Sequence, residues 1–137
     1  MMTTTELKQL ITTKNVIFYK PSCPFSACGL GLLTYLQNTG VLHDLNVVYL
    51  DQDFTNEQLK DICTEYGWSG ESEFPSKPQT FLNQRGTTEY ISGNDGLHSS
   101  IWNLGEGETG EITVNGESYT APKWTNPMDN LTRKHQI

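Results

Sequence analysis

The chain of 137 residues carries a formal net charge of -7, and this length suits one domain with a short extension. The acidic charge disfavours nucleic acids and anionic membranes as partners, because both attract clusters of Lys and Arg. No apolar run reaches the about 20 residues of a membrane-spanning helix, and no secretory leader is visible, so we expect a soluble cytoplasmic protein. Three cysteines do not make an even-numbered disulfide framework, so we expect free thiols.

The first half of the chain alternates helical and strand patterns. Leucines three residues apart predict a short helix over Glu6–Ile11, after threonines that suit its cap. The apolar run Val16–Tyr19 predicts a buried strand. Leucines at helical spacing then predict a helix over Phe25–Thr39 that ends at Gly40, so this strand leads directly into a helix.

The second half repeats this unit and then changes. Val47–Leu50 predicts a second buried strand, and Thr55–Tyr66 a helix capped by its threonine. Two strands, Gln79–Leu82 and Thr88–Ile91, flank a turn and predict a hairpin, after which we expect a last helix from Asn94 to about Leu104. Two strand–helix units imply parallel pairing, and the hairpin adds antiparallel strands, which predicts a mixed α/β sandwich over residues 1–104.

Residues 105–137 have a different composition, rich in Gly, Glu, Thr and Asn. Alternating apolar positions over Ile112–Tyr119 surround the pair Asn115 and Gly116, which is a strong hairpin signal. We therefore expect a C-terminal extension made of a β-hairpin and a tail.

Cys23 lies where the first predicted strand passes into a helix. Unpaired N–H groups and the positive end of the helix dipole favour a thiolate at such a position. Pro24 suits the first helical turn, and Lys20 brings a cation close to the sulfur. The competing interpretation is an inert buried cysteine, which is the commoner fate of this residue type.

Three short segments, in this order, resemble the glutaredoxin family. Lys20 to Ser26 (KPSCPFS) is similar to the active-site pattern Lys-x-x-Cys-Pro-Tyr-Cys, with Phe for Tyr and Ser for the second Cys. Ser76 to Leu82 (SKPQTFL) is similar to Thr-Val-Pro-Gln-Val-Phe-Ile, and Ile91 to Leu97 (ISGNDGL) to Ile-Gly-Gly-Cys-Asp-Asp-Leu. The resemblance implies a thioredoxin-like three-layer α/β/α sandwich with a central mixed four-stranded sheet.

The resemblance also implies a site for glutathione as co-substrate. Cys23 would be the nucleophile, a cis bond would precede Pro78, and the turn before the last helix would bind the γ-glutamyl carboxylate. The binding residues would be Lys20, Phe25, Ser26, Lys77, Pro78, Gly93, Asn94 and Asp95. Taken singly, Pro78 would be an ordinary turn proline and Lys77 a solvent-facing loop lysine.

Ser26 at the position of the second cysteine excludes a Cys-x-x-Cys disulfide and leaves a monothiol route. In that route Cys23 takes glutathione from a mixed disulfide and is regenerated by a second glutathione, so glutathionylated or disulfide-containing proteins are the expected partners of a monomeric enzyme. Cys28, about 140° around the helix from Cys23, and Cys63 are expected in the core.

Two other functions remain open. Relatives with Cys-Gly-Phe-Ser bridge two subunits through an iron-sulfur cluster held by the thiolate and glutathione, and Phe25 and Ser26 match that form while Pro24 does not. Alternatively, the chain is a thioredoxin-fold binding module that lacks redox turnover. The histidines, His43, His98 and His135, have no metal spacing, so no zinc site is predicted.

Overall fold

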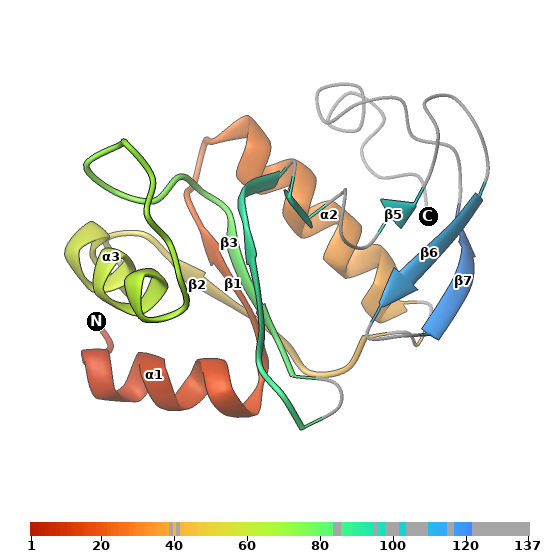
Figure 1. Ribbon diagram of the computed structural model, residues 1–137, viewed down its shortest axis with the longest axis horizontal. Helices are drawn as coiled ribbons and strands as arrows, with labels where there is room; N and C mark the ends of the chain where they lie inside the picture. The colour runs from red at the N-terminus through yellow and green to blue at the C-terminus, as the bar shows by residue number, and fades with distance from the viewer. Residues whose placement is uncertain are drawn as a thin grey trace.

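The computed structural model describes residues 1–121 except 39, 41, 84–85, 95, 98–101, 104–109 and 115–116; after residue 101 it describes the backbone alone. The elements are α1 (Thr4–Thr13), β1 (Asn15–Tyr19), α2 (Pro24–Asn38), β2 (Leu45–Tyr49), α3 (Asn56–Glu65), β3 (Gln79–Leu82), β4 (Glu89–Ser92), β5 (Trp102–Asn103), β6 (Gly110–Val114) and β7 (Glu117–Ala121) (Figure 1). Helical backbone also occurs at residues 93, 94, 96 and 97. No helix in the described ranges has the length and apolar character needed to cross a membrane.

The central sheet has four strands in the order β2-β1-β3-β4. β1 and β2 are parallel, with Ile17 opposite Val47, whereas β3 is antiparallel to both β1 and β4. Helices α1 and α3 cover one face of this sheet and α2 covers the other (Figure 1). The fold is therefore the predicted thioredoxin-like three-layer sandwich with a mixed sheet.

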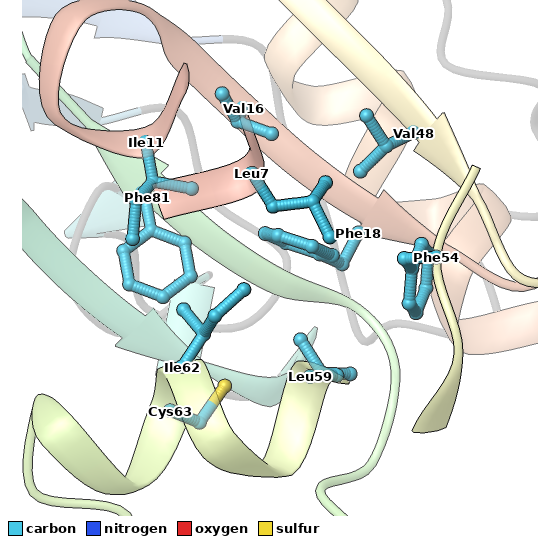
Figure 2. Close-up of a cluster of buried hydrophobic side chains, with 10 residues drawn as sticks. All are labelled: Leu7, Ile11, Val16, Phe18, Val48, Phe54, Leu59, Ile62, Cys63 and Phe81. Carbon is cyan, nitrogen blue, oxygen red and sulfur yellow. The ribbon is translucent and has the colours of Figure 1, made fainter. Parts of the chain in front are cut away.

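Two hydrophobic cores follow from the alternation of side chains along β1. Val16 and Phe18 point towards α1 and α3, where Phe18 packs edge-on against Phe54 with ring centroids 4.9 Å apart (Figure 2). Ile17, between them, points to the opposite face and packs with the leucines of α2. Because β1 is buried on both faces, its sequence is apolar from Val16 to Tyr19, and this run predicted a buried strand.

Two helices begin with complete capping boxes. The Thr3 hydroxyl accepts from the Glu6 N–H at the start of α1, and Thr55 with Gln58 repeats the arrangement at the start of α3. Each box satisfies two N–H groups that would otherwise lack partners. The predicted caps are thus confirmed.

The structure corrects two expectations about individual elements. β2 was expected to be buried, but it is an edge strand in which only Val48 is buried. β1 pairs with one of its edges, and no strand in the described part of the chain pairs with the other. The last helix was expected to reach about Leu104, but Trp102 and Asn103 form β5 and pair with β6. Pairing between strands overrides the local helical pattern there.

The second sheet has the strand order β5-β6-β7. β6 and β7 are antiparallel, with Val114 opposite Glu117, as the Asn-Gly signal predicted; the turn residues 115 and 116 lie outside the described residues. β5 lies before the predicted boundary at residue 104, and it pairs with β6, which lies after that boundary. The division into 1–104 and 105–137 stays a prediction.

Candidate active site around Cys23

A tight turn delivers Cys23 to the start of α2. The Cys23 N–H donates to the Lys20 carbonyl oxygen at 3.1 Å, and Ser22, the third residue of this turn, has a positive φ of 65°. Pro21 at the second position and a positive φ at the third are typical of a type II turn. The Cys23 carbonyl then accepts from the Ala27 N–H at 3.1 Å, so Cys23 caps the helix and Pro24 is its first residue.

Ser26 lies in the first turn of α2 and contacts the turn that precedes Cys23. It is fully buried, and its hydroxyl oxygen accepts from the Lys20 N–H at 3.2 Å. This contact fixes the backbone on the strand side of the turn, whereas the predicted contact of Ser26 with glutathione stays a prediction. The thiols of Cys28 and Cys63 are buried at 0% exposure, so Cys23, which is partly exposed, is the accessible thiol among the three.

The loop before β3 packs against α2. The Lys77–Pro78 peptide bond is cis, as the resemblance implied. A Cβ atom built on Gly29 of α2 would lie 2.8 Å from Pro78 Cγ, closer than real side chains approach, so the glycine permits this contact. The Pro78 carbonyl accepts from the Gly93 N–H at 3.0 Å, and Gly93 has a φ of +74°. Three segments distant in the sequence therefore meet at α2, the helix that Cys23 caps.

A pocket of about 220 Å³ opens between these segments. Its lining residues are Phe25, Ser76, Lys77, Ser92, Gly93, Asn94 and Gly96. Four of these lining residues were predicted to bind glutathione. One of the four, Phe25, is 46% exposed. Ser76 in a loop, Ser92 at the end of β4 and Gly96 in helical backbone were missed, because small residues at such positions carry no signal that separates a binding role from a structural one.

Asn94 is the most informative residue of the pocket. It is only 4% exposed, yet neither the oxygen nor the nitrogen of its side-chain amide has a hydrogen-bond partner. A buried polar group without a partner costs about 1–3 kcal/mol, and such groups are rare in folded proteins. The amide is thus an unsatisfied polar group enclosed in the wall of the pocket, with its oxygen near Gly29 of α2.

Lys77 is held beside the site and is not a solvent-facing loop lysine. Its side chain is partly buried, and the ammonium donates a hydrogen bond to Asn56 Oδ1. Burial lowers the pKa of Lys77, and the positive charge of Lys20 lowers it further, while the negative charges of Cys23 and Asp51 act in the opposite direction. Lys77 also lines one pocket with Phe25, which follows Cys23 by two residues.

Cys63 belongs to a buried polar cluster behind Lys77. Its Sγ lies 3.9 Å from Gln79 Oε1, which also accepts from the Tyr90 hydroxyl. Burial raises the pKa of Cys63 to about 12 and also raises the pKa of Tyr90. Cys63 is therefore a protonated core thiol at neutral pH, as expected for a residue that packs in α3.

The remaining predicted site residues divide into two groups. Lys20 is exposed in the turn before Cys23, and Pro78 is buried against α2. Asp95, His98 and His135 lie outside the described residues. Within the described ranges no three His, Cys, Asp or Glu side chains gather as metal ligands. Two of the three thiols are buried, so Cys23 is the accessible cysteine that could bind a metal. The iron-sulfur cluster stays a prediction.

No protein-family model matches the chain, and no curated protein matches it either. Among solved structures, the chain is similar to the crystal structure of oxidized glutaredoxin 2 from Chlamydomonas reinhardtii, with 17% sequence identity and a TM-score of 0.47. The similarity covers 71% of this chain and 79% of that chain. The chemistry of the site is inferred below from the residues of this chain.

Proposed function

We propose that the protein is a glutathione-dependent thiol-disulfide oxidoreductase of the monothiol type, with Cys23 as its nucleophile. One observation carries the proposal: an accessible thiol caps a helix next to a pocket that contains a buried amide without partners. The pocket offers a place for a ligand that delivers a sulfur atom to this thiol.

Glutathione matches the chemistry of this pocket. The Asn94 amide can donate to the γ-glutamyl carboxylate and accept from its α-ammonium group, which removes the cost of leaving the amide unpaired. Lys20 and Lys77 supply positive charge for the carboxylates of glutathione. The backbone beside Pro78 is a partner for the peptide groups of glutathione, and Phe25 covers one side of the groove.

The reaction needs one protein thiol. The Cys23 thiolate attacks the glutathione sulfur of a protein–glutathione disulfide, the S–S bond breaks, and the protein thiolate leaves and takes a proton from water. A second glutathione thiolate attacks the glutathione sulfur now bound to Cys23. Oxidised glutathione forms, and Cys23 leaves as thiolate, so Cys28 and Cys63 are not needed.

The decisive experiment compares two cysteine variants in the reduction of a glutathionylated peptide. We expect Cys23→Ser to abolish turnover and Cys28→Ser to retain it, because only the first residue is accessible. Incubation with oxidised glutathione, followed by mass spectrometry, should place a single adduct on the peptide that contains Cys23. Turnover that survives Cys23→Ser, or wild-type protein without turnover and without the adduct, would overturn the proposal.

A further inference from the structure

Asn56 is held rigidly at the start of α3. It is the first residue of the helix, directly after the cap Thr55, whose hydroxyl accepts from the Gln58 N–H at 3.1 Å. The Gln58 side chain accepts from the Thr55 N–H at 2.8 Å and donates to the Met2 carbonyl oxygen at 3.0 Å. The carboxamide of Asn56 therefore projects from a backbone that is anchored on both sides of it.

Lys77 is anchored at its backbone and again at its tip. The neighbouring Pro78 is packed against Gly29, and the Lys77 ammonium donates to Asn56 Oδ1. A free lysine side chain loses about 2 kcal/mol of rotamer freedom when it is fixed, so a single conformation needs a partner.

The chemistry of that partner matters for the charge near Cys23. Lys77 lines the pocket together with Phe25, and its side chain is hydrogen-bonded to Asn56. The charge of Lys20 repels the Lys77 ammonium while those of Cys23 and Asp51 attract it, and none of these three charges fixes the side chain in one place as a hydrogen bond does. A carboxylate at position 56 would hold the ammonium but cancel its charge. An amide oxygen holds it and leaves the positive charge intact.

We propose that Asn56 is a positioning residue that holds the Lys77 ammonium at the pocket that Lys77 lines with Phe25, two residues after Cys23 in the chain, so that a positive charge faces anionic disulfide substrates. The inference deepens the proposed function, because it concerns the same thiol and the selection of negatively charged substrates. Asn56 itself does not contact the reacting atoms.

The local potential at Cys23 can be measured without glutathione. Iodoacetate and iodoacetamide both alkylate a thiolate, which attacks the methylene carbon and displaces iodide, but only iodoacetate is an anion. The ratio of their rates at Cys23, followed on the peptide by mass spectrometry, reports the charge that faces the sulfur. We expect Asn56→Ala and Lys77→Met each to lower this ratio about threefold at low salt.

A double-mutant cycle separates positioning from a general effect on the fold. In the Lys77→Met background, Asn56→Ala should leave the ratio unchanged, because no ammonium remains to be positioned. Lys14→Met is the matched control: it removes one exposed lysine that pairs with Asp44, at the opposite end of β1, and should not change the ratio.

An unchanged ratio in Asn56→Ala, or an equal drop in the Lys77→Met background, would overturn the inference. Its failure is distinguishable from failure of the proposed function, because alkylation needs neither glutathione nor turnover. Where turnover is present, Asn56→Ala should raise KM for a glutathionylated peptide about threefold and leave kcat close to that of the wild type, since the lost attraction acts on substrate capture.

Discussion

Gly29 in α2 provides the most direct test of how the site is assembled. An alanine methyl at this position would lie 2.8 Å from Pro78 Cγ, 3.3 Å from Leu97 Cδ2 and 3.4 Å from Asn94 Oδ1. Non-bonded carbon atoms prefer about 3.5–4.0 Å, so the loop before β3 must move away from α2. Such overpacking costs about 1–3 kcal/mol.

A second effect of Gly29→Ala has the opposite sign. Replacing glycine by alanine inside a helix stabilises it by about 1 kcal/mol. The two effects together predict a decrease of about 0–2 kcal/mol in the free energy of unfolding. Because the added methyl pushes on both Pro78 and Asn94, we also expect slower capture of glutathione by Cys23 in this variant.

Gly96→Ala is the matched control for stability. Gly96 also has helical backbone, but its added Cβ would meet only Ile91 Cγ2, at 3.8 Å, which is an ordinary contact. Urea unfolding followed by circular dichroism should therefore give Gly96→Ala a stability equal to or above that of the wild type, and a higher stability than Gly29→Ala. Equal gains in both variants would show that α2 and Pro78 are not in close contact.

Two further predictions concern the buried polar groups. Burial raises the pKa of Cys63 from 9.0 to about 12, so above pH 9 the folded state keeps a proton that the unfolded chain loses. The resulting contribution to the free energy of unfolding is complete below about pH 9 and is lost as the pH rises towards 12. Between pH 9 and 10.5 the wild type should lose about 1 kcal/mol per pH unit more than Cys63→Ala, measured by urea unfolding, and parallel curves would contradict the assigned burial. Asn94→Leu removes an unpartnered buried amide and should raise the free energy of unfolding by about 1–3 kcal/mol while it slows glutathionylation of Cys23; a less stable variant would indicate that the amide has partners in the free protein.

Local patterns in the sequence were sufficient to predict the central domain. Capping threonines and leucine spacing located α1 and α3, because both signals act within one or two helical turns. The apolar run of β1 followed directly by a helix placed Cys23 at a helix start, and an Asn-Gly pair predicted the pairing of β6 with β7. The resemblance of three short segments further predicted the cis bond before Pro78.

Contacts between distant segments were decided only by the tertiary structure. Apolar β2 has the composition of a buried strand, but its place at the sheet edge depends on which strands pair with β1. The hydrogen bond between Lys77 and Asn56 joins a loop to a helix start, and no periodicity relates the two positions. Asn94 resembles any helix-capping asparagine in the sequence. Its amide becomes buried without partners because the side chain, like those of Pro78 and Leu97, packs next to Gly29 after the chain has folded. Such packing depends on three-dimensional distances that local sequence patterns do not specify.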